Sequence, residues 1–158
     1  MELYEQWLQR ADDIGLQVLE KMPFESQAKG LVCGNCIGLN QNLETVEEKT
    51  CVLAEEIIHT ERNVGNIIDQ RIEDNAKQEH KARRILYHEL ADLKSIAKLL
   101  KKGYKHTHEI AEKLGVTEEL LHDAIYNYRE EYGTYLFIGD DILYLEPTLI
   151  LKSRIKIN

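Results

Sequence analysis

Apolar residues recur at helical spacing along much of this chain, and the spacing changes to short apolar runs in two places. The first 20 residues carry an apolar stripe that fits one face of an amphipathic helix, which Met22-Pro23-Phe24 ends. Residues 29–39 instead hold two short apolar runs around Gly34-Asn35, a pattern typical of a β-hairpin with a two-residue turn. The pattern therefore predicts a helix over residues 1–20 and a hairpin after it.

A capping box marks the start of the next helix. Thr45-Val46-Glu47-Glu48 has the spacing in which a threonine hydroxyl and a glutamate satisfy the free N–H groups of a first helical turn. We expect this helix to run from about residue 46 to about residue 62 or 63, with Gly65 as the stop. A further helix is expected over about residues 71–91.

The remaining third of the chain favours short helices followed by a second hairpin. The expected helices cover residues 94–102, 107–114 and 118–131, with Thr117 as the N-cap of the last one. Two short apolar segments, 135–138 and 142–145, flank a turn and predict the hairpin.

Residues 109–121 resemble a helix-turn-helix, with an alanine in the first helix and a glycine in the turn. A recognition helix that enters the major groove should present basic and amide side chains. The second helix here presents mostly acidic ones, with Arg129 its only arginine or lysine. Repulsion from phosphate argues against DNA binding and favours a packing unit or a protein-docking surface.

The composition restricts the classes of protein that fit. The chain has 158 residues, of which 43% are hydrophobic and 30% charged, which suits one globular domain. No apolar run approaches the roughly 20 residues of a membrane span, and the N-terminus lacks the layout of a signal peptide. Three cysteines do not make a disulfide framework, so we expect a cytoplasmic protein. The net charge of −8 argues against general nucleic-acid binding.

Two of these cysteines form a C-x-x-C pattern, Cys33-Gly34-Asn35-Cys36. A redox enzyme would place this motif at the start of a helix, and a zinc knuckle would need a second pair of ligands. The chain contains no second C-x-x-C. We therefore interpret the motif as turn geometry with two semi-buried thiols.

The most informative pattern is Glu55-Glu56-Ile57-Ile58-His59. The zincin signature H-E-x-x-H places two histidines on one helix face, where they bind one Zn²⁺, and its glutamate serves as general base. Glu56 and His59 occupy the positions of the base and the second ligand. Glu55 stands where the first histidine is expected. The spacing predicts a metal site in which one ligand has changed.

Together, the hairpin, the capped helix with this motif and the helix after it resemble the ImmA/IrrE family of metallopeptidases, particularly its compact members from phages and mobile elements. The resemblance covers most of the chain, and the segments that carry it most clearly are Lys29-Gly30-Leu31, Ile37-Gly38-Leu39-Asn40, residues 47–59 and Gly65-Asn66-Ile67-Ile68-Asp69. It implies an α+β fold: an α-rich, zincin-like minimal domain with a small antiparallel sheet and a C-terminal helix-turn-helix-like unit.

In that family an acidic ligand follows on the next helix, within a Glu-x-x-Ala pattern that Glu79-His80-Lys81-Ala82 matches. The resemblance therefore implies Glu56 as the catalytic general base and three metal ligands, Glu55, His59 and Glu79. Spacing alone leaves Glu73 as an alternative third ligand, and His80 is chemically suited to replace Glu79.

Glu55 changes the charge of such a site. Two carboxylates bring two negative charges to the ion where the usual set of two histidines and one glutamate brings one, and this weakens the ion as a Lewis acid. The ligands suit Zn²⁺ or a harder ion such as Mn²⁺. Hydrolysis also needs a group that stabilises the oxyanion. The sequence does not choose among three neighbours of the third ligand, His80, Tyr87 and His88.

The resemblance implies a zinc-dependent, site-specific endopeptidase that relieves repression by cleaving a phage-type helix-turn-helix repressor. The alternative is a catalytically degenerate zincin-fold anti-repressor that acts by binding the same partner. We expect residues 1–92 to form the zincin-like metal-site region and residues 93–158 the helix-turn-helix-like unit with its C-terminal hairpin, packed as one domain.

Overall fold

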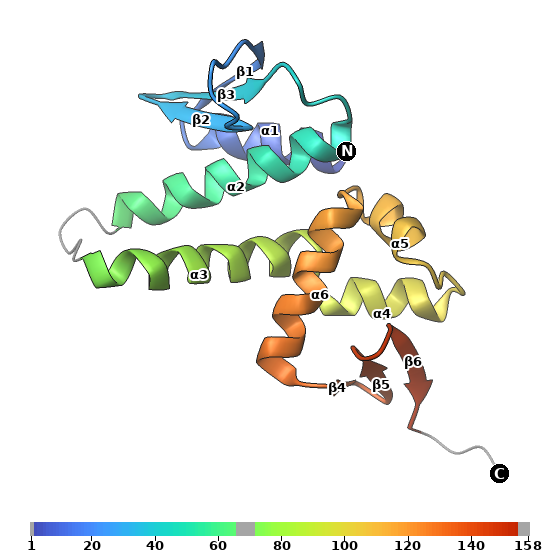
Figure 1. The fold of residues 1–158 in the computed structure, drawn as a ribbon. Coiled ribbons are helices and arrows are strands. Elements are labelled where there is room, and N and C mark those ends of the chain that lie inside the picture. The colour runs from blue at the N-terminus through green and yellow to red at the C-terminus, as the bar shows by residue number, and fades with distance from the viewer. Residues whose placement is uncertain (1, 66–71, 155–158) are drawn as a thin grey trace. The chain divides into compact units, whose positions relative to one another are not determined.

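The computed structural model describes residues 2–65 and 72–154 and combines helices with two small sheets, which confirms the α+β class (Figure 1). The chain divides into two compact units, Met1–Leu86 and Tyr87–Asn158. The domain boundary after residue 92 stays a prediction. Among the described residues, no helix combines the length and the apolar character that a membrane crossing requires.

The first unit begins with a helix that is shorter than the sequence pattern predicts. Helix α1 covers Leu3–Asp13, and strand β1 covers Gln17–Met22, so the prediction of one helix over residues 1–20 is wrong. Gly15 takes a positive φ of 80°, which stops the helix where other residues would be strained. The apolar residues beyond it belong to a strand, because β1 pairs with a strand further along the chain.

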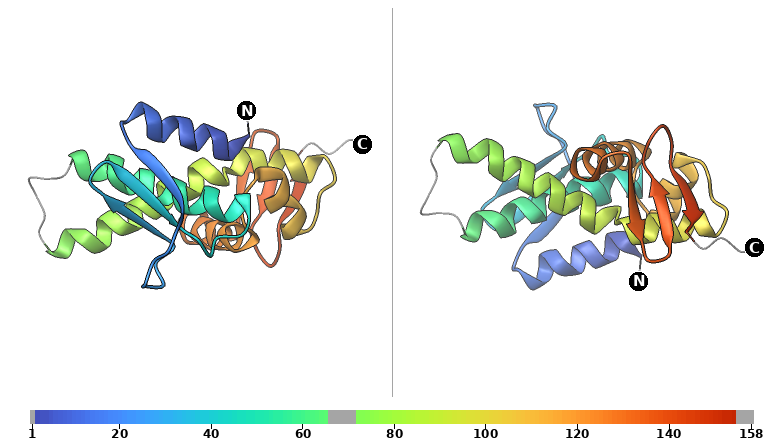
Figure 2. Two further views of the ribbon diagram at one scale, coloured as in Figure 1. Left: turned by 90° about the horizontal axis from the view of Figure 1, so that it is seen from above. Right: turned by 90° about the horizontal axis from the view of Figure 1, so that it is seen from below.

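The predicted hairpin is confirmed. Strands β2 (Gly30–Cys33) and β3 (Cys36–Asn40) pair antiparallel around Gly34-Asn35. β1 pairs in parallel with β3, which gives the strand order β1-β3-β2 and a mixed sheet rather than a purely antiparallel one. The central strand β3 is the buried one, and helices α1 and α2 lie on the same side of the sheet (Figures 1 and 2).

Helix α2 spans Val46–Gly65, so the predicted start is confirmed and the helix runs past the predicted end at residue 62 or 63 to include Gly65. Its capping box is formed, because Thr45 Oγ1 accepts a hydrogen bond of 3.0 Å from the Glu48 N–H. Arg10 of α1 donates two hydrogen bonds of 2.6 Å to the Glu61 carboxylate, which fixes α1 against α2.

Helix α3 spans Ile72–Leu90 and confirms the helix expected over about residues 71–91. Arg71, where that prediction begins, lies outside the described residues. Among the described side chains of α3 in the first unit, Ala82 and Leu86 are buried, and they lie one turn apart on the same face.

The second unit contains the three short helices that the sequence predicts. They are α4 (Leu93–Lys101), α5 (Thr107–Leu114) and α6 (Glu118–Tyr132). Thr117 Oγ1 accepts a hydrogen bond from the Leu120 N–H, as expected of an N-cap. The side chains of Glu118, Glu119, Asp123 and Glu130 are exposed on α6, so its acidic face points to solvent.

A three-stranded antiparallel sheet closes the second unit. Strands β4 (Tyr135–Ile138) and β5 (Asp141–Tyr144) form the predicted second hairpin. Strand β6 (Ile150–Ser153), which the sequence pattern did not predict, pairs with β5. The unit is held together around Tyr128, whose buried hydroxyl donates to the carbonyls of Tyr87 and Ala91.

Candidate metal centre

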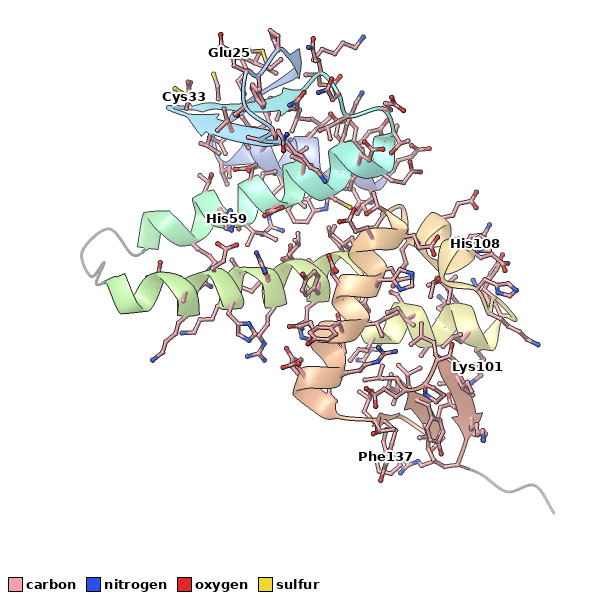
Figure 3. The ribbon with its side chains drawn as sticks, viewed as in Figure 1. Glu25, Cys33, His59, Lys101, His108 and Phe137 are labelled. Carbon is pink, nitrogen blue, oxygen red and sulfur yellow. The ribbon has the colours of Figure 1, made fainter. Side chains whose placement is uncertain are left out.

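Helices α2 and α3 bring together the three residues expected to bind a metal. One donor atom from each of Glu55, His59 and Glu79 lies within 4.8 Å of the others. Within this cluster, His59 Nε2 lies 3.3 Å from Glu79 Oε2. Figure 3 shows His59 on the side of α2 that faces α3.

The burial of α2 explains why these side chains meet. Leu53, Ala54 and Ile57 have no exposed surface, so they define the buried face of the helix. Glu55 and His59 lie one turn apart on the border of that face and are partly exposed. The apolar packing of α2 therefore sets the rotation that aims both donors toward α3.

Glu79 is held from its other side by Arg83, one turn along α3. Arg83 Nε lies 3.4 Å from Glu79 Oε1, while the second oxygen approaches His59. Such outer partners orient a metal-ligating carboxylate. The donors border a small pocket lined by Glu55, Ile58, His59, Ala82, Arg83 and Leu86. The i,i+4 spacing of Glu79 and Arg83 on one helix is the feature of the sequence that could have predicted this ion pair.

The donor set fits a divalent ion. Zn²⁺ accepts imidazole nitrogen and carboxylate oxygen at about 2.0–2.2 Å, and catalytic zinc sites use three protein ligands with one position left open. Donor atoms that share one tetrahedral ion at these distances lie about 3.3–3.6 Å apart. The atoms of the cluster lie within 4.8 Å of one another, so side-chain movements of about 1 Å bring them to binding distance.

Glu56 flanks this cluster and is packed against strand β2. A Cβ added at Gly30, the first residue of β2, would lie 3.1 Å from Glu56 Cγ and 3.3 Å from Glu56 Oε1. Burial is the main cause that raises the pKa of Glu56 above its ordinary value, and the charge of Glu55 adds to it. His59 acts in the opposite direction. The Gly30 contact was not predicted, although the hairpin entry itself was.

The other candidates lie either outside the described residues or apart from the described cluster. The side chain of Glu73 lies outside the described residues. His80 is exposed on α3, and the described cluster does not include it. Of the candidates for oxyanion stabilisation, His88 approaches Glu131 at 3.4 Å and stacks edge-on against Tyr128, so its ring takes part in the packing of the second unit.

Comparison with known proteins agrees with this geometry. The model of the IrrE N-terminal-like domain family, a peptidase family designated M78, matches residues 11–126. The chain belongs to this family. The match includes the hairpin, the helix with Glu55, Glu56 and His59, and the helix with Glu79. Neither the curated proteins nor the solved structures that were searched give a match. The IrrE-like family is one of metallopeptidases, and its divalent metal is usually zinc.

Proposed function

We propose that this IrrE-like protein is a zinc-dependent, site-specific endopeptidase whose substrate is a helix-turn-helix repressor of the phage type. One observation supports the proposal most strongly: Glu55, His59 and Glu79 converge from two helices, with Glu56 beside them on the same helix. Structural packing alone does not require three titratable side chains to converge where the helix meets solvent. A metal site requires such convergence, because several donor atoms must reach one ion.

Each residue then has a role that follows from its chemistry. Glu55, His59 and Glu79 would hold Zn²⁺, or Mn²⁺ in its place, and the ion supplies activation of water and polarisation of the scissile carbonyl. Glu56 accepts the proton of the attacking water and returns it to the leaving amine. A raised pKa favours this second step, because the protonated carboxyl is the form that donates.

Strand β2 offers a place for an extended peptide. Within the described residues β2 is an outer strand of its sheet, so its free edge can pair with another chain. The strand begins at Gly30, against Glu56. A peptide paired to this edge would pass close to the general base, which favours cleavage within a chain over removal of its end.

A second function is favoured by Glu55 itself. A carboxylate in place of the first histidine adds a negative charge to the site and weakens the ion as a Lewis acid. If the loss of Lewis acidity abolishes hydrolysis, the protein acts as a non-catalytic anti-repressor that binds the repressor without cutting it. The two functions differ in whether chelation abolishes the effect on the partner.

Metal stoichiometry is the first test of the peptidase. Tag-free protein purified without chelator is measured by mass spectrometry beside His59→Ala and, as a matched control, His80→Ala, which removes an exposed imidazole from α3. We expect about one zinc or manganese per chain in wild type and His80→Ala and a loss in His59→Ala. If the wild-type protein stays metal-free after zinc is added, the proposed peptidase function is refuted.

Cleavage is then tested on a purified helix-turn-helix repressor of the phage type. Glu56→Gln should retain the metal and lose cleavage, because the amide cannot accept the proton. Repressor binding that survives chelation, with no cleavage by any variant, would support the anti-repressor instead.

A further inference from the structure

Cys33 and Cys36 stand directly opposite each other at the closed end of the β2–β3 hairpin. They are register partners, separated by the two turn residues Gly34 and Asn35. Residues opposite each other in an antiparallel pair point to the same side of the sheet. Both thiols are free, Cys33 is exposed and Cys36 half-buried, which corrects the expectation of two semi-buried thiols. Figure 3 shows Cys33 at the tip of the hairpin, on the opposite side of α2 from His59.

The rest of the fold holds this end of the hairpin in place. The Gln17 N–H of β1 donates a 2.8 Å hydrogen bond to the Asn35 carbonyl, so the turn is tied to the neighbouring strand. Within the described residues the hydrogen bonds of the Cys36 thiol are long, 3.5 Å to Asn35 Oδ1 and 3.9 Å to Gln17 Oε1. Sulfur is a weak donor, so a stronger partner can replace these contacts at little cost.

The spacing favours a bridging ion over a disulfide. Opposite residues of an antiparallel pair have Cβ atoms about 4.5–5.5 Å apart. A disulfide needs about 3.5–4.5 Å and sulfur atoms about 2.05 Å apart. An ion about 2.3 Å from each sulfur allows the sulfurs to lie up to about 4.6 Å apart. The usual Cβ separation of such a pair is therefore closer to what a bridging ion needs than to what a disulfide needs.

The number of donors selects the ion. In the described part of the chain, no third cysteine, histidine or carboxylate joins the two thiols. Structural zinc needs four such ligands. Two thiolates alone suit a soft, singly charged ion with low coordination number, and thiolate ligands select Cu(I) among the biological metals.

We propose that Cys33 and Cys36 form a bis-thiolate site for a soft cation of the Cu(I) class, separate from the carboxylate–imidazole cluster. The two sites differ in ligand softness, so each takes a different ion from a mixture. Binding replaces two S–H protons by one cation and involves no change of oxidation state. The site is independent of peptidase activity and stands whether or not the repressor is cleaved.

The test is an anaerobic titration of tag-free, fully reduced protein with Cu(I), against a chromophoric Cu(I) chelator as competitor. We expect one tightly held Cu(I) per chain, with X-ray absorption showing only sulfur neighbours. Cys33→Ser and Cys36→Ser should each weaken binding by more than about 100-fold, beyond the effect of losing an outer partner. Cys51→Ser and His59→Ala are the controls and should bind as wild type does.

Several results would overturn this assignment. One is equal Cu(I) retention by wild type and the two hairpin variants. Another is a dependence on Cys51. A third is nitrogen or oxygen neighbours in the absorption spectrum. A Cys33–Cys36 disulfide that persists in excess reduced thiol would also exclude the site, because it consumes both donors. Circular dichroism of each serine variant ensures that lost binding does not reflect lost folding.

Discussion

Gly30 of strand β2 lies close to helix α2, and Gly30→Ala tests that approach directly. The added Cβ would lie 2.8 Å from Val52 Cγ1, whereas carbon atoms in contact normally lie about 3.5–4.0 Å apart. Val52 is buried and β-branched, so it cannot rotate away freely. Overpacking of this kind costs about 1–3 kcal/mol. For a chain of this length that corresponds to a fall in Tm of about 2–12 °C.

Trp7 provides the assay, because it is the single tryptophan and is buried in the same unit. Its fluorescence follows unfolding in urea for wild type, Gly30→Ala and the control Leu31→Ala. Leu31 is the next residue of β2 and is 48% exposed, so its replacement should change the free energy of unfolding by less than about 0.5 kcal/mol.

A double-mutant cycle with Val52 tests whether this contact causes the loss of stability. Val52→Ala removes the atom that the new methyl group would meet, so the double variant should lose less stability than the sum of the single changes. Cleavage should fall in Gly30→Ala, since the same methyl group presses on Glu56. Additive stabilities, or a Gly30→Ala variant as stable and active as wild type, would show that the close approach is absent in solution.

Three further results are expected. In chelator, the free energy of unfolding should decrease between pH 4 and pH 7 more for wild type than for Glu56→Gln. Folding raises the pKa of Glu56 above its ordinary value of 4.5, so in this pH range the folded state keeps a proton that the unfolded chain has lost. An equal pH dependence of the two proteins in urea titrations would contradict this. Tyr128→Phe should cost about 1–3 kcal/mol in urea unfolding, because it removes the 2.7 Å donor of the Ala91 carbonyl in a buried setting; a neutral result would show that water replaces it. Thr117→Ala should cost about 0.5–2 kcal/mol by calorimetry, and Thr117→Ser should restore most of it; equal losses would rule out the cap to Leu120.

The fold was predictable where local signals agree with tertiary packing. Thr45 and Thr117 are caps whose partners lie three residues away, so the helix starts follow from the sequence alone. Strand β1 could not be predicted this way. Its apolar residues fit a helix as well as a strand, and only pairing with β3 decides between them. Strand β6 could not be predicted from local sequence either, because it is defined by its pairing with β5, which is a tertiary contact.

The candidate site was predictable to the level of residue identity but not of geometry. Glu55 and His59 follow from one-turn spacing on a helix, and Glu79 followed from family resemblance. The structure adds the distance between the helices, the Arg83 contact to Glu79 and the approach of Gly30 to Glu56. These depend on how α2, α3 and β2 pack, which no local pattern encodes.

The outer strand β2 has a consequence for the behaviour of the protein at high concentration. Its free edge carries Leu31 and Val32, 48% and 39% exposed, and two copies can pair through this edge as readily as one copy pairs with a peptide. Such a dimer would occupy the strand beside Glu56 in both molecules. We therefore expect self-inhibition: the turnover per molecule should fall as the protein is concentrated, and dilution should restore it. The four-residue length of β2 keeps this association weak and reversible.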